Sequence, residues 1–250
     1  MNFRKAILFL FFLSHSLCAT EWPIVPDVTE EEIASYFLAE DHEMKPILDL
    51  LFQDRSVLKS NSSLKKAGFK VLHDRPSSMI IVSHPLLKGH LVKLHLNDSR
   101  RTKEQIWGNF VKRCKGADNI RKMIKEENIK FFTVADKWLY FPPFEEAAPL
   151  LLVTDMEVYE RNESREAWKT KITRKHIREV YSIIRRGLAS TSLPSNTPYT
   201  KNGNFAFVDT ESPFRYPMYN HARKHLSPEM QLYWDTLRKG DTGAVKDAHD

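Results

Sequence analysis

The sequence predicts an α+β protein in which a small antiparallel sheet is followed by helices. Short runs rich in Val, Ile and Leu, separated by turn residues, occupy residues 69–96 and 131–153. Beyond Tyr159 the apolar residues recur at three- and four-residue spacing, which is typical of amphipathic helices. With 42% hydrophobic residues the chain can bury one core, or two cores that share an interface.

The N-terminal segment, residues 1–19, is predicted to be a removable secretory signal. Arg4 and Lys5 form a basic start, residues 6–13 are apolar, and small residues precede Glu21, so cleavage is expected near Ala19. The apolar run is shorter than the ~20 residues that a membrane span needs, which disfavours an uncleaved anchor. No later segment is apolar enough to span a membrane, and we expect a secreted or periplasmic protein.

Cysteine content and charge argue against a disulfide-stabilised scaffold and against a nucleic-acid-binding protein. Removal of the signal leaves Cys114 as the single cysteine, so no intramolecular disulfide framework is expected. It also takes two of the 38 basic residues and none of the 32 acidic ones, which leaves a net charge of +4. The basic residues are interspersed with acidic ones and their local clusters are typical of solvated helix faces, so nucleic acid is not an expected partner.

Residues 20–66 are predicted to be a helical extension. Thr29 and Glu32 have capping-box spacing, and Val28 and Ile33 flank them as a hydrophobic staple, so a helix is expected to start here. The apolar run 47–52 predicts a second helix that begins near Asp41.

Residues 67–159 are predicted to form a sheet lobe. Turn compositions separate three runs that indicate a meander of antiparallel strands. A charged helical pattern follows, in which Gly108 and Gly116 favour two helices over one. The predicted strands are 69–73, 78–83, 90–96, 131–134, 137–141 and 150–153, and the predicted helical region is 101–124.

Residues 160–250 are predicted to form a helical lobe. The apolar stripe of its long helix consists of Ile177, Val180, Tyr181, Ile184 and Leu188. Residues 189–202 are expected to be irregular, and 204–208 to be a short strand. Residues 227–229 are predicted to open a last helix that Gly240 closes.

No zinc-protease, serine-hydrolase or phosphate-loop signature occurs, but one order of features is specific. Lys93 lies inside an apolar strand, and is followed by a helical segment, two strands, an acidic turn, a long helix, Pro194 and Asn196, and a strand that ends at Asp209. This order resembles the protein kinase-like superfamily, which includes the aminoglycoside phosphotransferases. The resemblance covers roughly residues 69–211 and implies a two-lobed fold with a sheet lobe and a reduced helical lobe.

The resemblance also implies site residues and cofactors. In that family a strand lysine holds the nucleotide phosphates, while an asparagine and an aspartate after the long helix bind Mg²⁺. Here Lys93, Asn196 and Asp209 stand at these positions, and the 13 positions from Asn196 to Asp209 resemble the interval between the family's two metal ligands. The implied cofactors are ATP, at Lys93, Asn196 and Asp209, and Mg²⁺, at Asn196 and Asp209.

Three departures from the family pattern predict a pseudokinase with at most weak nucleotide and Mg²⁺ binding. Thr191 stands where the family has its catalytic aspartate, and a hydroxyl is no base near neutral pH. The turn at 74–78 has no glycine to let the backbone approach phosphates. Residues 105–117 contain no acid to pair with Lys93.

The alternative hypothesis is a non-enzymatic exported α+β protein that binds a protein partner. Its candidate contacts are aromatic, because such residues are enriched in interfaces. They are Trp107, Trp138, Trp234 and the segment 216–219. Nucleotide binding distinguishes the two hypotheses.

Overall fold

The computed structural model describes residues 28–73, 79–144, 147–211 and 218–246. The predicted signal peptide at 1–19 and the glycine-free turn at 74–78 lie outside these residues. So do residues 20–27 of the predicted helical extension, residues 247–250 of the predicted helical lobe, and Tyr216 and Pro217 of the candidate contact segment.

The described part of the N-terminal extension consists of short helices. They are α1 (Glu30–Ser35), α2 (Lys45–Leu51), the 3₁₀ helix η1 (Arg55–Lys59) and α3 (Asn61–Lys66). The predicted capping box is confirmed, because the Thr29 hydroxyl accepts from Glu32 N and the Glu32 carboxylate accepts from Thr29 N. The predicted second helix is present and begins at Lys45.

A five-stranded antiparallel sheet follows, in the order β1-β2-β3-β6-β5. The predicted meander is confirmed, since β2 pairs with both β1 and β3 in antiparallel register. After α4 and β4 the chain returns to the sheet at its edge strand β5 and then enters β6, which lies between β3 and β5. The strands are β1 (Lys70–His73), β2 (Ile80–Ser83), β3 (His90–Leu94), β5 (Lys137–Tyr140) and β6 (Leu150–Thr154).

The predicted strand at 131–134 exists as β4 (Phe132–Val134), but it belongs to a different sheet. It pairs in parallel with β7 (Phe205–Phe207), with Phe132 opposite Phe205. The side chains of Phe132 and Phe205 are buried in the core cluster of the helical part. Assignment of this strand to a sheet lobe ending at residue 159 was therefore wrong, because its apolar side chains find their partners more than 70 residues later.

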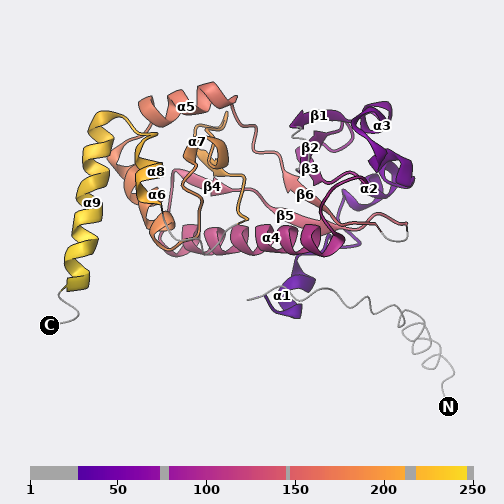
Figure 1. Ribbon diagram of the computed structural model, residues 1–250, viewed down its shortest axis with the longest axis horizontal. Coiled ribbons are helices and arrows are strands. Elements are labelled where there is room, and N and C mark those ends of the chain that lie inside the picture. Colours follow the sequence, from indigo (N-terminus) through magenta and orange to yellow (C-terminus); the bar gives the residue numbers. More distant parts are fainter. Residues whose placement is uncertain (1–27, 74–78, 145–146, 212–217, 247–250) are drawn as a thin grey trace, which may run out of the picture.

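The two helices predicted between residues 101 and 124 are one helix, α4 (Lys103–Glu126). A capping box of Thr102 and Gln105 starts it. Glycine lowers helix stability by only about 1 kcal/mol, and burial of ten α4 residues outweighs that cost. Figure 1 shows α4 running beneath both the sheet and the helices that follow it.

The C-terminal part is helical, as predicted. It contains α5 (Arg161–Thr170), α6 (Arg174–Arg185), α7 (Leu193–Asn196), α8 (Tyr219–Arg223) and α9 (Pro228–Lys246). Four of the five predicted stripe residues are buried on α6, where Ile177, Val180 and Ile184 are inaccessible to solvent, whereas Leu188 lies beyond the end of α6 and is half-buried. The expected end of the last helix at Gly240 is wrong, because Gly240 does not adopt the positive φ of a helix-ending glycine and α9 continues to Lys246.

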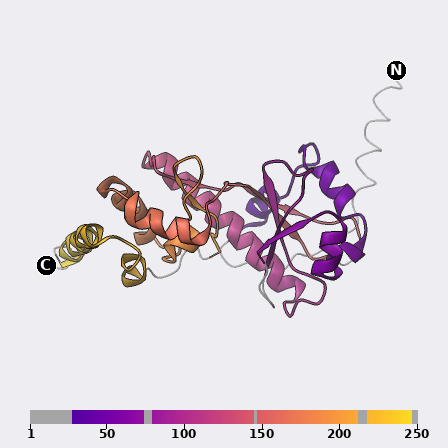
Figure 2. The same cartoon turned by 90° about the horizontal axis from the view of Figure 1, so that it is seen from above.

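The side chains form three buried clusters. One fills the helical part, one lies between the sheet and the N-terminal helices, and one lies between the sheet, α1 and α4. The view from above in Figure 2 shows α4 crossing from the sheet to the helical part. A single helix thus packs on elements from both ends of the chain.

Burial changes the interpretation of the predicted partner contacts. Trp107 and Trp234 are core residues with relative exposures of 1% and 0%, so neither can contact a partner as predicted. Trp138 is half-buried between the rings of His42 and His90, and Tyr219 is also half-buried, while Met218 is exposed. In the described part of the chain, no helix combines the length and the apolar character needed to cross a membrane.

Candidate functional site

Lys93 is a buried cation in the middle of the sheet. It lies on β3, opposite Ile81 of β2 and Leu151 of β6, and is only 5% exposed. A lysine in a strand commonly extends its ammonium group to solvent, but that of Lys93 instead donates a hydrogen bond to Val208 O at 2.8 Å. This contact joins the sheet to the segment after β7, 115 residues later.

The other two predicted site residues adjoin Val208 through the backbone. Val208 N donates to the main-chain carbonyl of Asn196 at 3.0 Å, and Asp209 is the next residue. The backbone of Val208 therefore connects the loop that carries Asn196, the segment that carries Asp209, and the Lys93 ammonium.

Arg113 of α4 is a functional candidate that the sequence interpretation missed. Its guanidinium Nη2 lies 2.6 Å from Glu211 Oε2, and its Nε lies 3.4 Å from Asp209 Oδ1. The Arg113 side chain is 8% exposed, while the side chains of Asp209 and Glu211 are 35% and 37% exposed. The only signal in the sequence was an arginine in the segment 105–117, where the family resemblance led us to look for a carboxylate.

The segment that follows Val208 is held on α4 by Thr210, which contacts the backbone of the helix. The Thr210 hydroxyl donates to Arg113 O at 2.6 Å. Gly116 faces the same residue so closely that a Cβ there would lie 2.1 Å from Thr210 O. Gly116 is thus required by close backbone approach, which explains why it is tolerated inside a helix.

Burial shifts the pKa values of two lysines in this region. The pKa of Lys93 is lowered to about 8, mainly by burial, with the Asp209 charge opposing the shift and that of Arg113 adding to it. Burial, with the Lys93 charge second, lowers the pKa of Lys137 to about 7. The Lys137 ammonium has a carbonyl, Ala135 O, at 3.4 Å. Lys93 therefore stays a cation at neutral pH, whereas Lys137 is close to its midpoint.

These shifts predict that the free energy of unfolding rises between pH 7 and pH 9. The folded-state pKa of Lys137 lies below its ordinary value of 10.5, so the unfolded chain binds more protons in this interval and deprotonation favours folding. Deprotonation of Lys93, whose folded-state pKa is about 8, also raises the free energy of unfolding above this pH. Above about pH 9 the rise should slow, because burial raises the pKa of the Cys114 thiol to about 12, and it should reverse only at about pH 10, where the raised pKa values of Tyr36 and Tyr140 act in the same direction as the thiol. Urea unfolding at each pH measures the profile.

The Lys137→Met variant should reduce this rise and be more stable than wild type at pH 7 by about 1 to 4 kcal/mol, the range found when buried charged groups are replaced by apolar residues of similar volume. Lys70→Met, at an exposed position on β1 of the same sheet, is the control and should leave the profile unchanged. A Lys137→Met protein that is less stable than wild type at pH 7 would contradict the assignment.

Thr191, at the position of the family's catalytic aspartate, is 6% exposed and faces a histidine. His221 Nδ1 lies 3.4 Å from the Thr191 hydroxyl and 3.1 Å from Thr191 O. A carbonyl oxygen only accepts, so the hydrogen bond to it puts a proton on Nδ1. That nitrogen is then no base, and neither residue supplies the missing carboxylate.

The arrangement of oxygens does not fit the predicted Mg²⁺ site. Mg²⁺ needs near-octahedral oxygen ligands at about 2.0–2.1 Å, whereas Asp209 Oδ1 faces Arg113 Nε and accepts from Glu211 N at 3.4 Å. Across residues 28–246, as far as they are described, no group of three or more His, Cys, Asp and Glu side chains could hold a metal ion.

Comparison with known proteins provides no related site against which this one can be compared. No protein-family model matches the chain, and no curated protein is significantly similar to it.

Proposed function

We propose that this chain is an exported, kinase-like protein of the pseudokinase type that binds a nucleotide weakly at the site around Lys93. The observation that carries the proposal is made at Val208, whose carbonyl accepts from the Lys93 ammonium, whose N–H donates to the Asn196 carbonyl, and which Asp209 follows in the chain. A buried ammonium group offers a point charge for phosphate oxygens.

The order of elements supports the same proposal. Lys93 on β3 is followed by α4, by β4, by β5 and β6 of the same sheet as Lys93, by α5 and α6, by Asn196 at the end of α7, and by β7 with Asp209 after it. Apart from β4 and α5, this is the order for which the resemblance to kinase-like proteins was drawn. The ribbon in Figure 1, with a sheet part and a helical part on the shared helix α4, is compatible with two lobes.

Absence of phosphoryl transfer is part of the proposal. The candidate for the catalytic base, Thr191, is a buried hydroxyl, which does not accept a proton near neutral pH. Export is the other part of the proposal and rests on the composition of residues 1–19. Sequencing the N-terminus of the native protein tests whether this signal is removed.

The alternative is a protein that binds a partner and no nucleotide. Fewer of its predicted contact residues are accessible to a partner than the sequence suggested. Of its candidate contacts, Met218 is 50% exposed and Trp138 and Tyr219 are half-buried, whereas Trp107 and Trp234 are buried. The nucleotide experiment below separates this alternative from the proposal.

Millimolar ATP should stabilise the folded protein, since a ligand that binds only the native state adds about 2.7 kcal/mol at a hundred times its Kd. The Lys93→Met variant should lose this effect, because it removes the ammonium but keeps a side chain that fills the sheet. Isothermal calorimetry and thermal unfolding measure binding and stability separately.

The matched control is Lys70→Met, which removes an exposed lysine of β1 and should bind like wild type. Equal ATP binding by Lys93→Met and wild type would refute the site. No binding by wild type would favour the partner-binding alternative, and transfer of the γ-phosphate to a substrate would refute the pseudokinase part.

A further inference from the structure

The side chains around Lys93 leave no excess negative charge for a metal ion to neutralise. Three cationic side chains are buried there, Lys93, Arg113 and Lys137, with residue exposures of 5%, 6% and 6%. Two carboxylates, Asp209 and Glu211, lie more exposed beside them. The formal sum of these five groups with every lysine protonated is +1, so the site favours an anion over a further cation.

Arg113 holds both carboxylates. One guanidinium reaches Glu211 through Nη2 and Asp209 through Nε, and it stays charged because arginine does not deprotonate in proteins. In the described structure Nε has no hydrogen-bond partner, and the Asp209 carboxylate lies at ion-pair distance from this side of the guanidinium. If Asp209 turned to a metal ion, this buried guanidinium would lose part of its compensation.

The chain segment that carries the two carboxylates is anchored on α4. The hydroxyl of Thr210, between them, donates to Arg113 O, and the backbone of Thr210 packs on Gly116. A movement of this whole segment toward a metal ion would break that bond and move Thr210 off α4. Both carboxylates therefore extend from a backbone that α4 holds beside Arg113.

We infer that Arg113 serves as the resident cation of this site, so that the site excludes divalent metal ions and receives the phosphates of a metal-free nucleotide on Lys93 and Arg113. The ligand class rests on the proposed function above, whereas the exclusion of metal ions rests on the Arg113 contacts alone. Binding of phosphates by a guanidinium needs no metal bridge, because its N–H groups match phosphate oxygens.

Titration with Mn²⁺ alone, followed by electron paramagnetic resonance, tests the exclusion of metal ions. Wild type should show no saturable binding at millimolar Mn²⁺, and Asp209→Asn should not change this. Arg113→Gln frees both carboxylates and should bind Mn²⁺ saturably, with a Kd about tenfold or more below the highest concentration at which wild type shows no binding. Adding Asp209→Asn to Arg113→Gln should abolish the new site.

The matched control is Arg121→Gln on the same helix. Arg121 also pairs with two carboxylates, Asp118 and Asp136, but its side chain is 42% exposed. This variant should gain no Mn²⁺ site. Saturable Mn²⁺ binding by wild type that Asp209→Asn removes would overturn the inference, and this outcome needs no Arg113 variant to fold.

ATP titrations in EDTA and in Mg²⁺ test the ligand class. Wild type should bind ATP at least as tightly in EDTA as in Mg²⁺. Binding that requires Mg²⁺ would refute the inference while supporting the proposed function. Absence of binding in both conditions would refute the proposed function and the metal-free ligand, and the Mn²⁺ titration would still decide whether Arg113 excludes metal ions.

Discussion

Gly116→Ala is expected to destabilise the protein by about 3 kcal/mol, the upper end of the usual cost of overpacking. The added Cβ would lie 2.1 Å from Thr210 O and 3.1 Å from Thr210 Cβ, so either α4 or the segment after β7 must move. Because the close atom belongs to the backbone, a side-chain rotation cannot relieve the clash. Urea unfolding measures the loss, and the displaced segment should also lose the Arg113 contacts to Asp209 and Glu211.

Gly108→Ala on the same helix is the matched control. Nothing lies within 4 Å of a Cβ placed at Gly108, so the substitution should stabilise α4 by about 0.5–1 kcal/mol through helix propensity. Opposite signs at two glycines eight positions apart would assign the Gly116 effect to packing. A stable Gly116→Ala protein would mean that Thr210 does not lie against α4.

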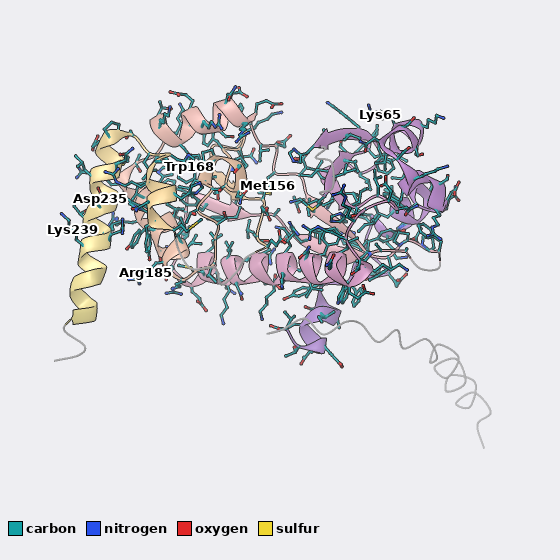
Figure 3. All side chains as sticks on the ribbon, viewed as in Figure 1. Lys65, Met156, Trp168, Arg185, Asp235 and Lys239 are labelled. Carbon is teal, nitrogen blue, oxygen red and sulfur yellow. The ribbon has the colours of Figure 1, made fainter. Side chains whose placement is uncertain are left out.

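Trp168→Ala is expected to have the largest effect, a loss of about 3–5 kcal/mol. Trp168 is fully buried on α5, with its ring 4.6 Å from that of Phe205 between centroids, and its indole Nε1 donates to Thr197 O at 2.8 Å. Figure 3 shows Trp168 beneath α5, inside the helical part. The truncation leaves a cavity beside the β4–β7 pair and an unpaired carbonyl.

The comparison for this variant is Trp138→Ala. Trp138 lies on β5 and is half-buried, with its ring against His42 and His90. Its truncation should cost less than half as much, because solvent can replace part of the lost contact. Equal losses of unfolding free energy at the two positions would contradict the burial of Trp168.

The sequence by itself determined the local elements. The capping box at Thr29, the meander of β1 to β3 and the buried stripe of α6 were predictable because each depends on residues within a few positions of one another. The order of Lys93, Asn196 and Asp209 along the elements was predictable for the same reason, since each residue was assigned to a strand or loop from its sequence neighbours.

Only the tertiary structure decided how these elements meet. The contact of Gly116 with Thr210, which explains a glycine inside the single helix α4, joins residues almost 100 positions apart. The pairing of β4 with β7 joins segments more than 70 positions apart. Arg113 forms ion pairs with Glu211, 98 positions later in the chain, and with Asp209, two positions before Glu211. Such contacts depend on how whole elements bury their apolar faces, and neither periodicity nor spacing along the chain carries that information.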